Sequence, residues 1–408
     1  MAMRWRGRRH GGMTIMGLAG GALCAVVLAA GCTAQPSPQF QATASSTILS
    51  ASDMQRFGLL FPDTSIGFVR AADGRYLAFA AGGSVSGIGQ GPGASPFGAY
   101  RFSGTLDHLS PASSGGQFPS PVLANGRRQP SPDAADFDLD YGGGGPTYPL
   151  GGGSSLLQIY HGEHRCAPEA GMPAMGGMGL AISRDGGASF VKLGEILAPH
   201  VGGDEFCRSG RRGGLWADGG MVAADAVGQR SAGNAYEYIL FVDHNALSER
   251  DTGISIARVS RAELLGAIAA GRAPRFMKYY NPNGAAGPPG PYFTEPGVGG
   301  ASTPVFVPGG FVGTPNVYFD DDLGQFLICY QTNQKRIMVA TSKDLFRWTG
   351  SSAVVEIPPD ASDHLYYPSA AGTGADPLIL GKTFYIYYLQ RTPPNTNPRL
   401  LRVTVSAP

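Results

Sequence analysis

The twelve residues GLAISRDGGASF, at positions 179–190, decide the fold of this 408-residue chain. The first part is a run of small and apolar residues typical of a strand. Ser183, Asp185 and Gly187 then supply the residue types of a tight turn. The Asp185 side chain can accept backbone N–H bonds across such a turn while the Phe190 ring packs beneath it. The stretch therefore predicts a hairpin whose turn is held by an aspartate.

The same order of elements recurs along the chain. An apolar strand comes first, a polar segment follows, and a strand of small and apolar residues comes next. The strand pairs are 155–161 with 179–190, 238–244 with 253–258, 326–331 with 337–348, 383–388 with 400–405, and an earlier pair, 66–70 with 76–80. Five such units over this length predict an all-β fold, a five-bladed β-propeller of four-stranded antiparallel blades.

Composition favours the same class of fold. The chain holds 62 Gly and 32 Pro, and short strands separated by turn residues fill most of it after residue 55. Helical periodicity is confined to residues 261–270. The run YGGGGP at 141–146 has no helix after it, so we expect a flexible connecting loop, able to act as a lid, and no phosphate-binding turn.

The N-terminal segment predicts export. Residues 1–31 carry four arginines and no acid, and the stretch 14–31 is uncharged and mostly apolar. The sequence VLAAGC at 27–32 resembles a lipobox, at which bacterial lipoproteins are cleaved and acylated on the cysteine. We predict a signal peptide over 1–31 and a lipid on Cys32; an uncleaved N-terminal anchor is the alternative. Either way the body lies in the cell envelope, on the outer side of a membrane.

The remaining body is close to neutral. Removing residues 1–31 changes the formal net charge of +1 to about −3, because that segment holds four positive charges and no negative ones. Such a body lacks the basic field that nucleic acids need, so we expect no nucleic-acid partner. Residues 32–50 are rich in Ser, Thr, Ala, Gln and Pro and predict a flexible tether. The propeller is expected over 51–408, as a monomer held to the membrane through Cys32.

Three cysteines remain in the body. Cys329 lies in the apolar run FLICY and is expected to be a buried thiol. Cys166 and Cys207 lie in polar, Gly-rich segments of a chain that we expect to be exported. Because exported proteins keep disulfides, we predict that these two cysteines form one.

Two turns carry a resemblance to known enzymes. Residues 183–190 match the Asp-box pattern of sialidase-like propellers, and residues 342–348 resemble the Ser-x-Asp-Leu-x-x-Trp turn of five-bladed glycoside hydrolases. Segments at 276–280, 295–300 and 366–369 also look like parts of bacterial propellers of the arabinanase, fructosidase and sialidase type. The resemblance implies a propeller that acts on a polysaccharide or oligosaccharide, with the turn aspartates structural. We expect no cofactor.

Strand order sorts polar residues by face. With the strands of a blade lettered A (inner) to D (outer), the D-to-A and B-to-C connections lie at one end of the central channel. The A-to-B and C-to-D turns lie at the other end. The aspartate turns are C-to-D turns and mark this second end, the far face. We therefore expect the binding site at the first end, the mouth.

Glycoside hydrolysis needs an acid that protonates the leaving oxygen and a carboxylate that acts as base or nucleophile. Related propeller hydrolases take an Asp from the first inner strand and a Glu from a later blade, which by position fits Asp63 and Glu163. His161 would orient Glu163, and Asp218 is a candidate supporting carboxylate, as are Glu205 and Asp243. Alternatively, Asp63 only caps a turn, and Glu163 is a solvated acid.

Other side chains at the mouth are expected to bind the sugar through hydrogen bonds or flat rings, although rings at these positions also suit blade packing. They are Tyr160, His164, Glu205, Trp216, Asp243, His244, Asn316, Tyr366 and Tyr367. The histidines and acids of this region lack His-x-x-x-His spacing, so we expect no metal site.

Three functions stay open. The first is an envelope-anchored propeller that hydrolyses a glycan with Asp63 as base and Glu163 as acid. The second is a non-catalytic lipoprotein that binds a glycan or a protein at the same mouth. The third, a metalloenzyme, would require three side chains that converge on one ion.

Overall fold

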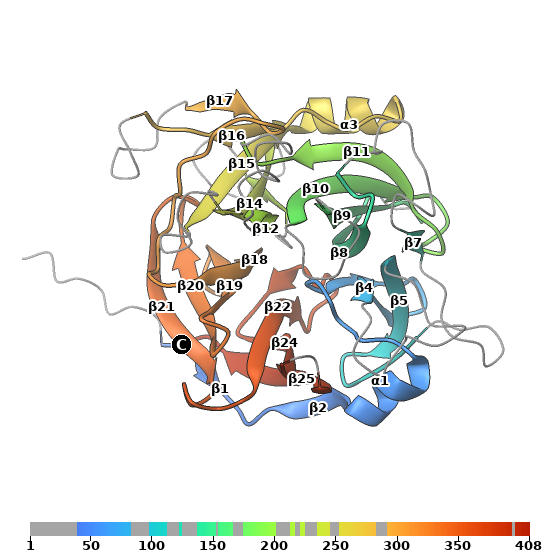
Figure 1. Ribbon diagram of the computed structural model, residues 1–408, viewed down its shortest axis with the longest axis vertical. Helices are drawn as coiled ribbons and strands as arrows, with labels where there is room; N and C mark the ends of the chain where they lie inside the picture. Colours follow the sequence, from blue (N-terminus) through green and yellow to red (C-terminus); the bar gives the residue numbers. More distant parts are fainter. Residues whose placement is uncertain are drawn as a thin grey trace, which may run out of the picture. The chain divides into compact units, whose positions relative to one another are not determined.

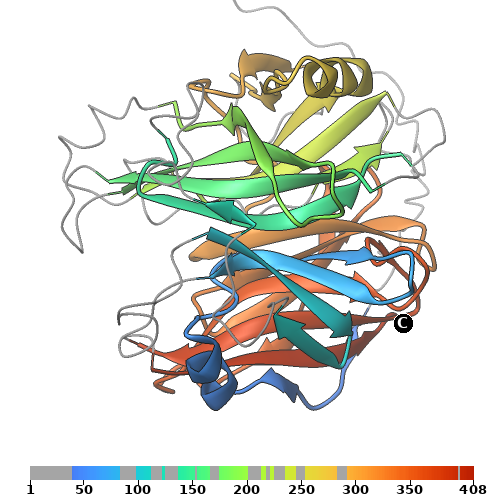
Figure 2. The same ribbon diagram turned by 90° about the vertical axis from the view of Figure 1, so that its right-hand side faces the viewer.

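A computed structural model of the chain describes residues 39–82, 98–111, 122–124, 137–151, 154–165, 174–200, 213–216, 221–224, 235–244, 253–282, 292–393 and 396–408. These residues belong to the compact unit Ser37–Pro408. Five blades surround a central channel, as predicted (Figure 1). Seen from the side, the first blade lies between the second and the fifth (Figure 2).

The first two blades are antiparallel sheets in chain order. The first blade consists of β3 (Gly67–Arg70), β4 (Tyr76–Gly82), β5 (Gly98–Thr105) and β6 (His108–Pro111), with β7 (Leu123–Ala124) beside β5. The second consists of β8 (Tyr141–Pro149), β9 (Leu156–Arg165), β10 (Ala174–Ser183) and β11 (Val191–Leu197).

The third and fourth blades repeat this order. The third consists of β13 (Met221–Ala224), β14 (Tyr236–His244), β15 (Ile254–Ser260), β16 (Met277–Tyr279) and β17 (Phe293–Pro296). Strand β12 (Gly213–Trp216) pairs with both β10 and β14 and joins the second and third blades into one sheet. The fourth consists of β18 (Val312–Asp320), β19 (Gln325–Thr332), β20 (Arg336–Ser342) and β21 (Trp348–Glu356), with β23 (Ile379–Leu380) beside β18.

The fifth blade is completed by the N-terminal part of the propeller. Its inner strands are β22 (His364–Gly372), β24 (Thr383–Thr392) and β25 (Thr396–Ser406), and β1 (Gln41–Ala42) and β2 (Ser46–Leu49) pair with β25. Residues 41–42 and 46–49, which we placed in the tether, thus form strands that pair with β25, and the propeller starts earlier than residue 51. The reason is local: Ile48 and Leu49 are buried, although the surrounding composition is that of a tether.

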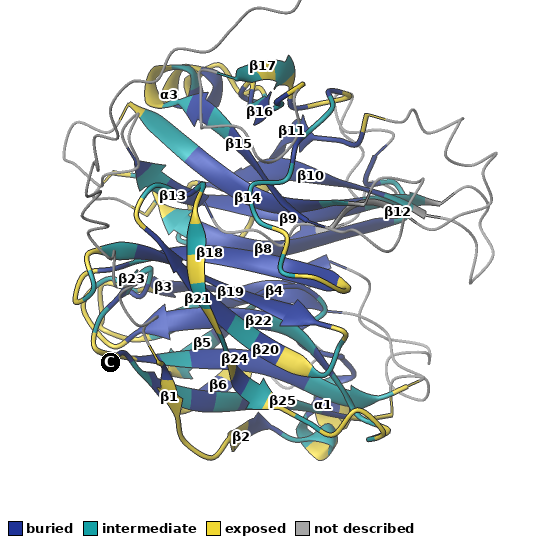
Figure 3. Cartoon of the chain, turned by 90° about the vertical axis from the view of Figure 1, so that its left-hand side faces the viewer, coloured by how far each residue is buried: buried dark blue, intermediate teal, exposed yellow. Residues whose placement is uncertain are grey.

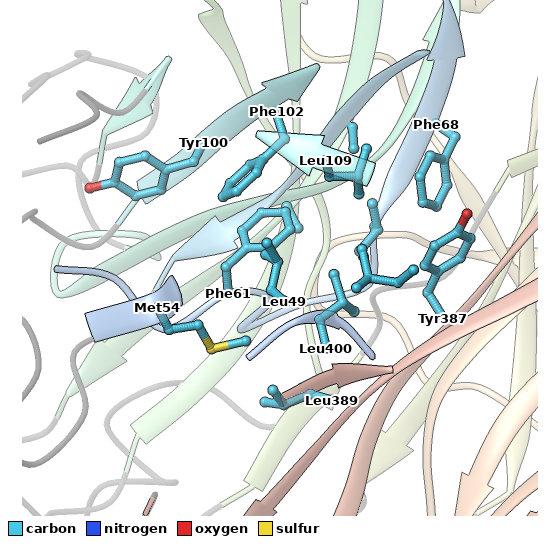
Figure 4. Packing of buried hydrophobic residues seen from close by; sticks show 14 of the residues in the cluster. Leu49, Met54, Phe61, Phe68, Tyr100, Phe102, Leu109, Tyr387, Leu389 and Leu400 are labelled. Atoms are coloured by element: carbon cyan, nitrogen blue, oxygen red, sulfur yellow. The ribbon is translucent and has the colours of Figure 1, made fainter. Parts of the chain in front are cut away.

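Apolar side chains fill the space between neighbouring blades. Between the first and fifth blades, Leu49 and Leu400 meet Phe68, Phe102 and Tyr387 (Figure 4). Met54, on helix α1 (Ala51–Phe57), is fully buried in the same cluster. The α1 helix starts at a capping box formed by Ser50 and Asp53. Burial is greatest along the strands, and exposed residues gather at the turns (Figure 3).

The far-face turns have the form expected from the sequence. Asp185, between β10 and β11, accepts hydrogen bonds from the Ser189 backbone N–H at 3.0 Å and the Ser183 hydroxyl at 2.7 Å. Asp344, between β20 and β21, accepts from the backbone N–H groups of Phe346 and Arg347 at 2.9 and 2.8 Å. The Asp185 and Asp344 side chains are thus hydrogen-bonded within their own turns.

Two further expectations are confirmed. Helix α3 (Arg261–Ala269) covers the segment with helical periodicity. Cys329 is fully buried, and burial raises the pKa of its thiol. Within the described ranges, the helices are too short or too polar to cross a membrane.

The glycine-rich run 141–146 was expected to be a loop, and that expectation is wrong. These residues form most of β8, the inner strand of the second blade. A Cβ on Gly143 would lie 2.5 Å from Cβ of Ala81, and one on Gly144 would lie 2.1 Å from Oε1 of Gln158. The glycines therefore serve the close packing of strands around the channel.

Candidate active site

Segments from the first, second and fifth blades meet at the mouth. Asp63 lies in the segment that leads into β3, and Glu163 lies near the end of β9. Tyr141 is the first residue of β8, and Arg391 is near the end of β24. All four positions follow the same rule, since an A strand starts and a B strand ends at the mouth.

Asp63 is held by three side chains. Its Oδ1 accepts a hydrogen bond from the Tyr367 hydroxyl at 3.2 Å and lies 3.8 Å from a guanidinium nitrogen of Arg391. The Tyr141 hydroxyl lies 3.1 Å from the main-chain oxygen of Asp63 and 3.4 Å from its Oδ2. The Asp63 side chain is 19% exposed, so a ligand at the mouth can reach it.

The surroundings raise the pKa of Asp63. Burial is the main cause, and the Arg391 charge opposes it. The negative charge of Glu163 raises this pKa further, while the hydroxyls of Tyr367 and Tyr141 lower it. The pKa of Asp63 is therefore higher than that of an ordinary aspartate, and the charge of Glu163 contributes to the increase.

Glu163 and His161 point to the same side of β9 because residues two apart share a strand face. His161 Nε2 lies 3.4 Å from Oε1 of Glu163. The His161 side chain is 7% exposed and that of Glu163 is 19% exposed. Tyr141 is the strand partner of Glu163, and its ring packs edge-on against the His161 ring at 5.9 Å. Tyr141 therefore contacts Asp63 through its hydroxyl and lies beside Glu163 in the sheet.

Aromatic rings of the fifth blade line the site. The rings of Tyr366 and Tyr367 lie 5.7 Å apart, and the Arg391 guanidinium stacks over Tyr366 at 4.2 Å. Tyr367 has a φ of 55°, in the left-handed region, and the pairing of β22 with β24 is interrupted between Tyr366 and Ser369. Its backbone N–H donates to Oε1 of Gln331 at 3.2 Å. This bulge aims the Tyr367 hydroxyl at Asp63.

Asn316 lies in the channel and joins three blades. Its amide nitrogen donates to the Ser65 hydroxyl at 2.6 Å and to the main-chain oxygen of Pro368 at 2.9 Å. The side chain is fully buried, so Asn316 holds the segments of Asp63 and Tyr367 together. In this arrangement it positions the site and does not face the mouth.

Three other residues that we expected to bind the sugar make contacts away from Asp63 and Glu163. Tyr160 is 1% exposed and packs against Phe137, because it points to the opposite face of β9 from His161. Asp243 accepts a hydrogen bond from the Ser302 hydroxyl at 2.7 Å and lies close enough to influence the buried Lys278. His164, about one-third exposed, lies 3.7 Å from Asp140.

The remaining predicted residues cannot be placed. Cys32, Cys166, Cys207, Glu205 and Asp218 lie outside the described residues, so the disulfide, the lipid site and two supporting acids stay predictions. The side chains of Trp216 and His244 also lie outside what the structure describes. Among the described side chains, no three His, Cys, Asp or Glu residues converge as metal ligands would.

Sequence reasoning missed Tyr141 and Arg391. Arg391 ends a B strand, so the rule that selected Glu163 could have found it in the fifth blade. Tyr141 was hidden because the glycines after it suggested a loop. Both are polar partners of Asp63. Their positions at the start of an A strand and near the end of a B strand would have identified them.

The blades define the fold as a five-bladed β-propeller, and solved structures of similar fold include glycoside hydrolases. A family 117 glycoside hydrolase of the marine bacterium Zobellia galactanivorans has the same fold, with a TM-score of 0.53, 11% identity, and 90% of each chain covered. The fold assignment rests on this likeness and on the blades themselves.

Weaker matches were found to two other hydrolases. The catalytic domain of a family 62 α-L-arabinofuranosidase of Coprinopsis cinerea gives a TM-score of 0.47 at 11% identity, covering 91% of this chain and 97% of that one. An endo-1,5-α-L-arabinanase of Thermotoga petrophila gives 0.44 at 12% identity, covering 84% and 71%. No protein-family model and no curated protein sequence matches the chain.

Proposed function

We propose that this chain is an envelope-anchored glycoside hydrolase that cleaves a polysaccharide or oligosaccharide at the propeller mouth. The observation that supports this most is the arrangement of Asp63 and Glu163 around Tyr141, with both acids partly exposed. Two carboxyl groups that act on one glycosidic bond are what such hydrolysis requires. The fold supports the same class of substrate, since the compared propeller of Zobellia galactanivorans is a glycoside hydrolase.

In this proposal Asp63 is the base. Its raised pKa makes the carboxylate a better proton acceptor near neutral pH than an ordinary aspartate. Arg391 and the Tyr367 hydroxyl favour its ionised form and fix its position. Glu163 is the acid that protonates the leaving oxygen, and His161 orients it. Tyr366 and Tyr367 offer flat faces to a sugar ring.

Attachment to a membrane through a lipid on Cys32 is part of the proposal. Its support is the lipobox-like sequence at 27–32, preceded by a basic and then an apolar segment. A glycan-active protein on the outer side of a membrane would meet its substrate there.

A binding protein without activity is the second candidate. It is favoured by the contacts of Asp63, which already has three side-chain partners, as a structural acid would. In that case the tyrosines and Arg391 would bind a glycan, and the acids would only hold the mouth together.

A screen of the chain 33–408 against plant and bacterial polysaccharides separates these functions. The chain must include residues 41–49, because they complete the fifth blade. We expect at least one polysaccharide to release oligosaccharides. Binding of a glycan with no release would support the second candidate, and neither binding nor release would reject both.

A further inference from the structure

The fifth blade places an arginine beside the candidate base. Arg391, near the end of β24, is paired with His364 at the start of β22, and the two strands lie side by side (Figure 1). The Arg391 guanidinium stacks on the Tyr366 ring at 4.2 Å and lies 3.8 Å from Oδ1 of Asp63. This separation from Asp63 is too long for a hydrogen bond. Arg391 is therefore near an acid without being tightly paired with it.

A second stacked arginine of the same blade is paired more closely. Arg402, on β25, stacks on Tyr385 at 4.1 Å, and its side chain is 12% exposed, as is that of Arg391. Arg402 lies 2.5 Å from the Asp107 carboxylate and donates to the main-chain oxygen of Leu106 at 3.1 Å. Stacking uses the face of a guanidinium and leaves its N–H groups in the plane, where an oxyanion can accept two of them. Among the described residues, Arg391 has no carboxylate as close as this, so an anionic ligand can take that place.

A lysine adds positive charge to this part of the mouth. Lys335, in the connection between β19 and β20, donates to the main-chain oxygens of Ala361 and Asp363, both at 2.7 Å. Burial lowers the pKa of His364, and the positive charges of Lys335 and Arg391 lower it further, while the charge of Asp363 opposes them. The two positive charges thus act on the same region of the fifth blade.

The acids of this region do not fill the space beside Arg391. The Asp363 carboxylate accepts hydrogen bonds from Gln390 and Thr392, both at 2.5 Å, and lies 3.2 Å from a guanidinium nitrogen of Arg399. Asp360, in the connection that leads into β22, is exposed to solvent, where salt screens its charge. The charge of Arg391 therefore remains available to an anionic ligand.

We infer that the glycan bound at the mouth is acidic, and that Arg391 binds a carboxylate or sulfate group on the sugar next to Asp63. Asp63 and Glu163 come from the first and second blades, whereas Lys335 and Arg391 come from the fourth and fifth. A sugar can therefore place its glycosidic bond at the acids and its anionic group at the basic residues. The inference rests on the glycan site proposed above, and it does not require that the glycan is cleaved.

Calorimetry on the full chain in detergent, at low ionic strength, compares glycans in matched acidic and neutral pairs. One pair is trigalacturonate and its carboxyl-reduced form, and the other is a sulfated galacto-oligosaccharide and its desulfated form. We expect the acidic member of one pair to bind about 10- to 100-fold more tightly than its neutral partner, because hydrogen bonds between a guanidinium and an oxyanion are charge-assisted. The pair that shows this preference identifies the anionic group.

Equal affinity of the acidic and neutral members in both pairs would overturn the inference and leave the hydrolase proposal intact. Absence of binding by all four glycans would also overturn it, while the polysaccharide screen tests the hydrolase proposal separately.

Three variants assign the preference to a residue. Arg391→Met keeps an apolar contact with Tyr366 and removes the charge, so it should abolish the preference for the acidic glycan. Arg391→Lys keeps the charge without the planar donors and should retain part of the preference. Arg402→Met removes the other stacked guanidinium, which contacts a far-face turn through Asp107, and should leave the preference within about twofold of the wild type. A preference that survives in Arg391→Met, or one lost equally in Arg402→Met, would refute the role of Arg391.

Discussion

The Tyr141 hydroxyl lies 3.1 Å from the main-chain oxygen of Asp63 and 3.4 Å from its carboxylate, while the Tyr141 backbone is paired with Glu163. One side chain thus connects the inner strand of the second blade to the segment that carries Asp63. The positions of the two acids relative to each other depend on this contact.

Replacing Tyr141 by Phe removes the hydroxyl and keeps the ring that packs on His161. We expect kcat on the identified glycan to fall by about 10- to 100-fold, because Asp63 loses a positioning donor. The free energy of unfolding should change by only about 0.5–1.5 kcal/mol. Tyr236→Phe, near the far-face end of β14, is the matched control and should keep full activity. Equal kcat for the two variants would show that the Tyr141 contact has no role.

Replacing Asp63 by Asn should separate activity from stability. Activity should fall by about 100-fold or more, because the base is lost. The raised pKa means that the folded protein binds this proton more tightly than the unfolded chain does. The wild type therefore loses stability as the pH rises from the unfolded-state pKa through the folded-state pKa.

The Asn variant is free of this loss, so its stability relative to the wild type should increase across that pH range and be level above it. Urea denaturation at pH 4 and pH 7 measures the difference. A stability difference between the variant and the wild type that does not grow from pH 4 to pH 7 would contradict the burial of a charged Asp63.

Lys192 and Asp138 form a buried ion pair beside Tyr160. Lys192→Met leaves the Asp138 carboxylate without its counter-ion, and we expect a loss of about 3–5 kcal/mol in the free energy of unfolding. Asp138→Asn in the same chain should restore part of the loss. The exposed pair Arg336–Glu356 is the control, because Arg336→Met should cost less than about 1 kcal/mol. Similar losses for both single variants would mean that Asp138 is solvated.

The N-terminal strand should be required for stability. Leu49 is 3% exposed in the core between the first and fifth blades, so Leu49→Ala should cost about 2–5 kcal/mol. Ser46→Ala changes an exposed residue of the same strand and should have an effect below about 0.5 kcal/mol. Urea denaturation of both variants checks this. An unchanged unfolding free energy for Leu49→Ala would argue that β2 is dispensable.

The fold could be predicted because its signals are local. Each blade has its own strand pattern and turn, and residues 183–190 show both within one short stretch. The closure of the fifth blade could not be predicted, because β1 and β25 lie at opposite ends of the chain. Nor could β8, since its glycines disfavour strands in isolation and only the crowded channel explains them.

The site was partly accessible in the same way. Strand lettering sends Asp63 and Glu163 to one end of the channel, where Tyr141 contacts Asp63 and is the strand partner of Glu163. Strand lettering does not say to which face of a strand a side chain points. Tyr160 was therefore expected at the mouth, although it lies in the core. The hydroxyl of Tyr367 reaches Asp63 only through a backbone bulge that no residue pattern announces.

The most direct test of the proposed hydrolase is the turnover of Glu163→Gln on the glycan found by the screen, with binding measured in parallel by calorimetry. The substitution keeps the shape of the side chain and removes its proton. We predict that kcat falls by about 100- to 10,000-fold while the Kd of the glycan changes little. Release of oligosaccharides at the wild-type rate would contradict the role of Glu163 and with it the proposed pair of acids.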